Sequence, residues 1–177
     1  MIALDPGGTT GWSVICVEQD ALSDPDVSIL RSIAHKAQGQ VDLVDEDEHV
    51  GVLVELLAAW PYAAVVVEDF ILRKYVKGRE LLSPVRITAK VEYCFKRGLE
   101  GIDPPGRRIW LQQPGMAMST ATDARLKDWG LYVSAGGEEH ARDATRHAIT
   151  FLRRAGDRPK LRHAAWPMTY DTDGEID

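Results

Sequence analysis

Hydrophobic positions in the first third of the chain fall in short runs separated by turn residues, which is the pattern of β-strands. Residues 2–4 predict a short buried strand, and residues 12–17 predict a second strand with partial alternation of apolar and polar side chains. The tight turn at residues 6–11, Pro-Gly-Gly-Thr-Thr-Gly, joins them as a β-hairpin. A third antiparallel strand is expected over residues 27–33, which completes a meander.

The pattern then changes to helical spacing. Apolar residues recur at i, i+3, i+4 and i+7 from Val50 to Leu57, after an acidic run at residues 45–48 that favours a helix N-terminus. Pro61 should end this helix, and residues 63–67 are a continuous apolar run, typical of a central strand covered on both faces. The other expected elements are a helix at 83–98, a strand at 108–111, a short helix at 122–129 ended by Gly130, and a helix at 138–154 with Gly156 as its C-cap.

This order predicts an α/β fold with a mixed five-stranded sheet, an antiparallel meander followed by parallel strands that helical crossovers connect. The chain has 177 residues, of which 45% are hydrophobic, enough for one domain with its own core. We expect this domain to cover residues 1–156, and the polar residues 157–177 predict an extended or disordered tail. No apolar stretch approaches a membrane span, and Cys16 and Cys94 suit reduced, packed thiols, so we expect a cytoplasmic protein.

Basic residues concentrate in the middle of the chain, although the net charge is −6. Residues 71–108 contain ten Lys and Arg against four Asp and Glu. The ten are Arg73, Lys74, Lys77, Arg79, Arg86, Lys90, Lys96, Arg97, Arg107 and Arg108. This stretch predicts contacts with nucleic-acid phosphates, with a solvated helical surface as the alternative.

Acidic residues close two of the apolar strands. Asp5 follows residues 2–4, Glu68 and Asp69 follow residues 63–67, and Asp143 lies on the last long helix. A carboxylate beside a core costs several kcal/mol unless it is paired or coordinates a metal. Three acids of this kind predict a divalent-cation site. Successive side chains of a strand point to opposite faces, so only one of Glu68 and Asp69 can point to this site.

These residues carry a resemblance to a known family. An opening hydrophobic-Asp-Pro-Gly followed by Thr and Gly, at residues 4–11, resembles the RuvC-like Holliday junction resolvases of the RNase H-like superfamily. The hydrophobic-Glu pair at Glu68 and the late His-x-x-Asp of His140 and Asp143 are similar to that family as well. Residues 122–127 resemble its phage-type members, and the whole resemblance covers about residues 1–154.

The resemblance implies an RNase H-like fold and a crossover junction endodeoxyribonuclease. It implies that Asp5, Glu68, His140 and Asp143 hold two Mg²⁺ or Mn²⁺ ions, which hydrolyse phosphodiesters of branched DNA in recombination and repair. Two opposed cuts imply a homodimer, with the helix at residues 83–98 as the expected interface. The source would be a bacterial cytoplasm or a phage that infects one. Phe70 would wedge into the junction, Arg73, Lys74, Lys77 and Arg79 would contact phosphates, and Lys127 would lie near the scissile phosphate.

Several alternatives stay open from the residues alone. Asp5 also suits a turn before Pro6, Asp69 competes with Glu68, and Glu139 and His147 compete with His140. Phe70 also suits the core. The opening motif is similar to the phosphate-binding hairpin of actin-like ATPases, and the same ligands serve nucleases of forks, flaps or RNA/DNA hybrids. A DNA-binding module that does not catalyse is a further alternative.

Overall fold

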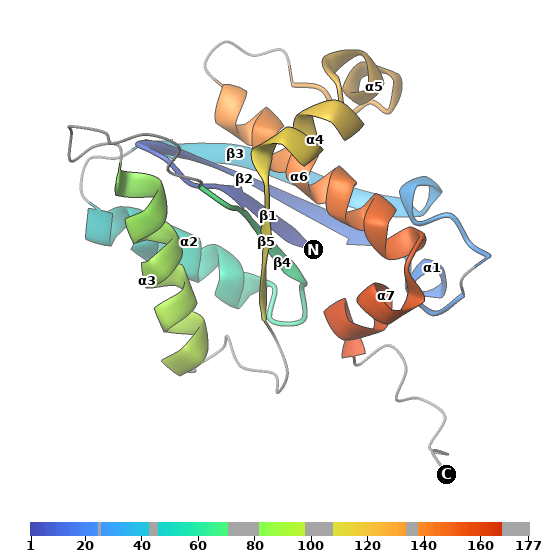
Figure 1. The fold of residues 1–177 in the computed structure, drawn as a ribbon, viewed down its shortest axis with the longest axis horizontal. Helices are drawn as coiled ribbons and strands as arrows, with labels where there is room; N and C mark the ends of the chain where they lie inside the picture. The colour runs from blue at the N-terminus through green and yellow to red at the C-terminus, as the bar shows by residue number, and fades with distance from the viewer. Residues whose placement is uncertain (25, 43–45, 71–81, 98–107, 134–137, 168–177) are drawn as a thin grey trace.

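The chain folds around a five-stranded mixed sheet with helices on both faces (Figure 1). The computed structural model describes residues 1–24, 26–42, 46–70, 82–97, 108–133 and 138–167. The strands are β1 (Ile2–Asp5), β2 (Thr9–Val17), β3 (Ile33–Asp42), β4 (Val65–Glu68) and β5 (Ile109–Gln112). The helices in this part of the chain are α1 (Asp20–Ser23), the 3₁₀ helix η1 (Ile29–Arg31), α2 (Glu46–Ala59), α3 (Ser83–Arg97), α4 (Pro114–Thr120), α5 (Asp123–Asp128), α6 (Glu139–Gly156) and α7 (Pro159–Ala165).

The order of strands across the sheet is β3-β2-β1-β4-β5. β1, β2 and β3 form an antiparallel meander, while β4 runs parallel to β1 and β5 runs parallel to β4. This is the predicted fold class, a mixed five-stranded sheet in which an antiparallel meander is followed by parallel strands. Because β1 and β4 are parallel neighbours, their carboxyl ends meet at the same edge of the sheet.

The two faces of the sheet bury different side chains. Ile2 and Leu4 of β1 pack with α2 and α3 on one face, whereas Ala3 packs with α6 on the other. Strand alternation explains the division, since successive side chains point to opposite faces. The predicted apolar stripe of α6 is confirmed, because Ala141, Ala144, Ala148 and Leu152 are all fully buried. α6 therefore lies directly on β1 and β2, where Figure 1 shows it crossing the sheet.

The prediction for the third strand was wrong by several residues. Residues 27–33 mostly form a turn and η1, and the strand that pairs with β2 is β3 (Ile33–Asp42). Val27, Ile29 and Leu30 pack into the core beside α6 instead of joining the sheet, and of the apolar residues in 27–33 Ile33 alone belongs to β3. β3 is an edge strand with many polar side chains, so its sequence lacks the apolar run on which the prediction depended.

The interpretation of residues 157–165 as extended was also wrong. α7 forms there and packs on α6, with Arg162 2% exposed and Trp166 next to Phe151. The Arg162 guanidinium donates hydrogen bonds to the carbonyl oxygens of Asp24 (2.9 Å), Ala155 (3.3 Å) and Gly156 (2.9 Å). Gly156 is the last residue of α6 and not a cap after it, since the C-cap is Asp157. Residues 168–177 lie outside the described residues.

The smaller predicted helix and the thiols agree with expectation. α5 begins after Thr122, whose hydroxyl accepts a hydrogen bond from the Arg125 backbone N–H at 3.4 Å. Gly130 follows with a φ of 64°, a conformation that favours glycine. Cys16 and Cys94 are free. Within the described residues, every helix is too short or too polar to cross a membrane.

Candidate functional site

Asp5 and Glu68 meet where β1 and β4 end. Leu4 pairs with Val67 in the parallel ladder, so the next residue of each strand brings its carboxyl group to the same place. Asp5 is only 8% exposed. Burial, and then the negative charge of Glu68, raise the pKa of Asp5 from its ordinary value of 3.8 to about 7. The pKa of Glu68 is lowered instead, so Asp5 is the member of the pair that binds a proton more readily.

Two histidines of α6 flank this carboxyl pair. His140 Nδ1 lies 2.9 Å from Asp5 Oδ2, and His147 Nε2 lies 2.8 Å from Glu68 Oε2. Residues i and i+7 are two turns apart on one helix face, which lets both rings reach the end of the sheet. Burial raises the pKa of Glu68, but the hydrogen bond with His147 lowers it, and that pKa lies below its usual range.

Gly11 allows α6 to approach this closely. It pairs with Asp5 across the β-hairpin, and a Cβ atom at position 11 would lie 1.9 Å from the His140 carbonyl oxygen and 2.6 Å from the Ala141 nitrogen. Both obstacles are backbone atoms, which cannot move without shifting the helix. The glycine of the opening motif therefore sets the distance between the sheet and the first turn of α6.

Asp143 occupies a different environment from the other three predicted ligands. Its carboxylate forms an ion pair with Arg146, three residues later on α6, and the same guanidinium binds Asp123. Arg146 Nε also donates to the Ala121 carbonyl oxygen at 3.1 Å. The structure therefore brings Asp5, Glu68 and His140 together, with His147 beside them, while Asp143 is held by Arg146.

The alternatives at two positions have distinct places in the structure. Glu68, not Asp69, interacts with Asp5 and His147, and the Asp69 backbone N–H instead donates to the Gln112 carbonyl oxygen at 2.9 Å. His140, not Glu139, contacts Asp5, since the Glu139 side chain is 80% exposed and lies 3.9 Å from Arg142. The sequence predicts His147 only as an alternative to His140. The structure places both histidines at the site, and the i, i+7 spacing that puts them on one helix face is visible in the sequence.

The donor chemistry of this group fits a divalent cation. Carboxylate oxygens are the ligands that Mg²⁺ prefers, and Mn²⁺ accepts imidazole as well. Burial and the negative charge of Glu68 raise the pKa of Asp5, and a bound cation would relieve the repulsion between the two carboxyl groups. In the described part of the chain, no three His, Cys, Asp or Glu side chains are already arranged around one metal position, since each carboxylate is hydrogen-bonded to a histidine or paired with Arg146.

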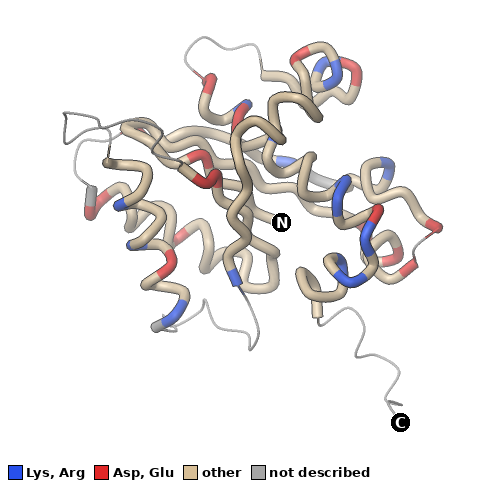
Figure 2. The backbone as a smooth tube through the Cα atoms, viewed as in Figure 1, with Lys and Arg blue, Asp and Glu red and all other residues tan. Residues whose placement is uncertain are grey.

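The predicted DNA-contact residues are only partly described. Arg73, Lys74, Lys77 and Arg79 lie outside the described residues. Phe70 is partly buried, two residues after Glu68. Lys127 lies exposed on α5, with its Nζ 4.6 Å from the centre of the Tyr132 ring. Figure 2 shows acidic positions near the centre of the view, where β1 and β4 end, and basic positions along α3 and the C-terminal part of α6.

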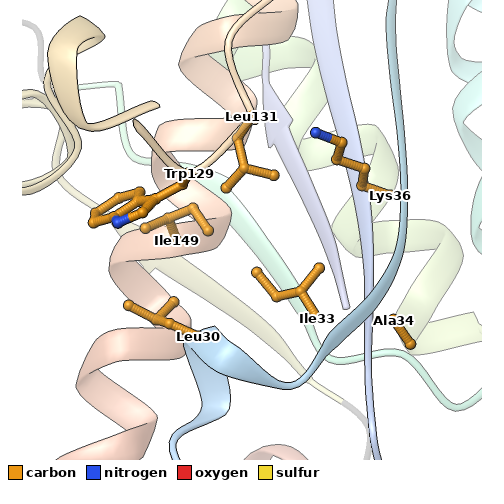
Figure 3. A pocket seen from close by; sticks show the side chains of 7 residues that line it. All are labelled: Leu30, Ile33, Ala34, Lys36, Trp129, Leu131 and Ile149. Carbon is orange, nitrogen blue, oxygen red and sulfur yellow. The ribbon is translucent and has the colours of Figure 1, made fainter. Parts of the chain in front are cut away.

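A pocket elsewhere in the fold shares no lining residue with the site formed by Asp5, Glu68, His140 and His147. It has a volume of about 590 Å³ and lies between η1, β3, α6 and the segment after α5 (Figure 3). Its lining residues are Leu30, Ile33, Ala34, Lys36, Trp129, Leu131 and Ile149. The lining is mostly apolar and contains no carboxylate, so this pocket offers no ligand for a cation.

The fold of the chain is RNase H-like, a mixed sheet with an antiparallel meander followed by parallel strands. Among solved structures it is similar to Thermus thermophilus RuvC in complex with a Holliday junction substrate, with a TM-score of 0.58, 17% identity, and coverage of 88% of this chain and 94% of that one. A second RuvC structure from the same organism gives a TM-score of 0.51, 16% identity, and coverage of 88% and 95%. No protein-family model and no curated protein sequence matches the chain. At this identity the similarity establishes the fold.

Proposed function

We propose that the chain is a metal-dependent endonuclease that cleaves branched DNA, of the Holliday junction resolvase type. One observation carries the proposal: the carboxyl groups of Asp5 and Glu68 meet at the ends of two parallel strands, with His140 Nδ1 2.9 Å from Asp5, in a fold similar to a RuvC solved in complex with a junction. A buried pair of this kind destabilises a metal-free protein, which a structural role alone does not explain.

The chain's own residues would have distinct roles in the reaction. Asp5, Glu68 and His140 would hold the cations, and Asp143 would join them once its ion pair with Arg146 opens. When bound, two Mg²⁺ or Mn²⁺ ions supply activation of the attacking water and stabilisation of the leaving 3′-oxygen in an in-line displacement at phosphorus. Burial of Asp5 keeps bulk water away from the acids, so that their charges act strongly on a bound cation.

The basic residues would provide the binding surface for DNA. α3 presents Arg86, Lys90 and Lys96, and the predicted contacts Arg73, Lys74, Lys77 and Arg79 precede it in the chain. Such contacts hold phosphates without reading bases. Phe70 would stack on an exposed base pair, and Lys127 would contact a phosphate from α5. Val85 and Tyr93 are exposed on α3, which supports this helix as the surface through which a homodimer would place two active sites.

A cleavage assay tests this function directly. Purified protein is incubated with four-way junctions, forks, flaps and RNA/DNA hybrids, with and without Mg²⁺ or Mn²⁺, beside Asp5→Asn and the control Glu55→Gln. Glu55 is an exposed acid of α2, so its substitution removes the same charge away from the site. We expect metal-dependent cutting of the junction by the wild type and by Glu55→Gln, and none by Asp5→Asn. Junction binding without any cutting would refute the proposal that the chain is an enzyme. Preferred cutting of RNA/DNA hybrids would refute the proposal that branched DNA is its substrate.

A further inference from the structure

Glu68 has a buried partner that the proposed chemistry does not use as a ligand. The His147 side chain is 1% exposed and its Nε2 lies 2.8 Å from Glu68 Oε2. A ring with this exposure has no access to substrate or solvent. His147 can therefore act on the site only through the carboxylate that it touches.

Gln112 fixes which nitrogen of His147 carries the proton. Gln112 Nε2 lies 3.0 Å from His147 Nδ1 and donates to the His147 carbonyl oxygen at 3.3 Å. An amide nitrogen only donates, so Nδ1 must accept, and Nε2 must carry the hydrogen that faces Glu68. The opposite orientation of the amide would place Gln112 Oε1 against the His147 carbonyl oxygen, where two acceptors repel.

The sheet places this pair next to the site. Gln112 is the last residue of β5 and pairs with Glu68 in the parallel ladder, so both side chains point toward α6. Gln112 is 2% exposed, and its Oε1 has no hydrogen-bond partner in the described structure. An unsatisfied buried acceptor costs about 1–3 kcal/mol, which an apolar residue would avoid. A core position that served packing alone would gain from a leucine here.

We propose that Gln112 and His147 are positioning residues that hold the Glu68 carboxylate in one orientation for cation binding. This inference rests on the proposed metal-dependent function. His147 occupies Oε2 of Glu68, which leaves the other carboxylate oxygen for the side shared with Asp5. Partners of this kind behind a metal ligand change metal affinity or activity by about 10–100-fold when they are removed.

Mn²⁺ binding to the protein without DNA provides the main test. His147→Leu removes the donor to Glu68, whereas His147→Gln keeps an N–H donor near the position of Nε2. Gln112→Leu leaves the imidazole and its donor to Glu68 but removes the amide that holds Nδ1. The control is Thr145→Val, a change at another buried residue of α6 whose hydroxyl bonds Ser13, Gln38 and the Ala141 carbonyl oxygen, away from the carboxyl pair. Circular dichroism confirms that each variant is folded.

We expect the Mn²⁺ dissociation constant, measured by calorimetry, to rise about 10–100-fold in His147→Leu. The rise should be clearly smaller in His147→Gln, and Thr145→Val should bind as the wild type does. In ¹⁵N spectra of the wild type, His147 should carry its hydrogen on Nε2. Gln112→Leu keeps the Nε2–H donor to Glu68 but no longer holds Nδ1, so it should weaken Mn²⁺ binding less than His147→Leu does.

Wild-type affinity in His147→Leu, or a hydrogen on Nδ1 of His147 in the wild type, would overturn the inference. If His147→Leu does not fold, the tautomer and Gln112→Leu still decide the question. Weakened Mn²⁺ binding in a protein that cleaves no DNA would leave this inference standing and refute the proposed nuclease. A wild type that binds no Mn²⁺ would overturn both.

Discussion

Gly11 lies against the backbone of His140, so close that a Cβ atom at position 11 would meet the His140 carbonyl oxygen at 1.9 Å. This contact joins the hairpin that presents Asp5 to the helix that presents His140. The distance between the two side chains therefore depends on an absent methyl group. This close contact explains why the opening motif has a glycine at position 11, without any role in phosphate binding.

Gly11→Ala should impair both stability and the site. The added methyl group forces the first turn of α6 away from β2, which should cost at least about 2 kcal/mol of unfolding free energy. At about 2–4 °C for each kcal/mol, the melting temperature should fall by several degrees. Thermal melting and the cleavage assay measure the two effects. Gly8→Ala is the matched control, because a Cβ atom there would meet nothing within 4 Å; equal losses in both variants would contradict the packing argument.

Asp5→Asn should stabilise the metal-free protein at neutral and higher pH. The pKa of Asp5 is raised to about 7, so the folded chain binds more protons than the unfolded chain between about pH 4 and pH 7. The stability that this proton gives is present below pH 4 and is lost as pH rises to 7. Asparagine keeps the hydrogen-bonding shape of the protonated acid and does not titrate. The gain above pH 7 should be on the order of 2 kcal/mol.

Urea unfolding in EDTA at pH 5 and pH 8 measures this effect. The wild type should lose stability relative to Asp5→Asn between the two values. Glu68 contributes in the opposite sense, since its depressed pKa gives stability that is lost as pH falls, but it is present in both proteins. A constant difference between the two proteins across this range would show that Asp5 does not carry the proton.

Arg146 and Asp123 should differ sharply in their effects on stability. The Asp123 side chain is 52% exposed, so Asp123→Ala should cost no more than about 1 kcal/mol. Arg146 is buried, and Arg146→Met removes the donor to the Ala121 carbonyl oxygen together with both ion pairs, so it should cost about 1–3 kcal/mol. Chemical denaturation of the two variants measures the difference. Similar costs would mean that the Arg146–Asp123 pair, and not the carbonyl contact, anchors this guanidinium.

Junction binding should require a divalent ion even when no cleavage is possible. Without a cation, the ionised acids of the site repel the phosphate that must approach them. Adding Ca²⁺ should therefore tighten binding to a four-way junction, and the gain should be smaller for Asp5→Asn, because this variant offers the cation one carboxylate fewer. Fluorescence anisotropy at fixed ionic strength measures both. Equal affinity with Ca²⁺ and with EDTA would contradict the repulsion.

Part of the site could be predicted because strand ends have a fixed geometry. A carboxylate directly after a buried apolar run has little choice of position, and Asp5 and Glu68 both follow such runs. Parallel pairing of β1 and β4 then brings them together. The choice of His140 came from the resemblance to the resolvase family, since the residues alone left Glu139 and His147 as alternatives. The meeting of Asp5 and Glu68 depended on local pattern and one topological rule.

Other features depend on contacts that the sequence pattern does not encode. Arg162 looks like a surface residue, yet it is buried because three carbonyl oxygens at the ends of helices accept its hydrogen bonds. Gln112 is the last residue of a strand, and the sequence pattern does not show that its amide contacts His147. The Arg146 contact with Asp143 changes a predicted ligand into one member of an ion pair. Each involves a polar group whose partner is distant in the chain or set by tertiary packing.

The polar character of β3, which obscured this strand in the sequence, has a consequence for self-association. An edge strand leaves backbone donors and acceptors open to pairing with another chain, and β3 is the longest strand of the sheet. Lys36, Gln38 and Gln40 along it disfavour the flat apolar contact that intermolecular sheet extension requires. The opposite edge, β5, has only four residues. Both borders of the sheet are thus protected against growing into fibrils.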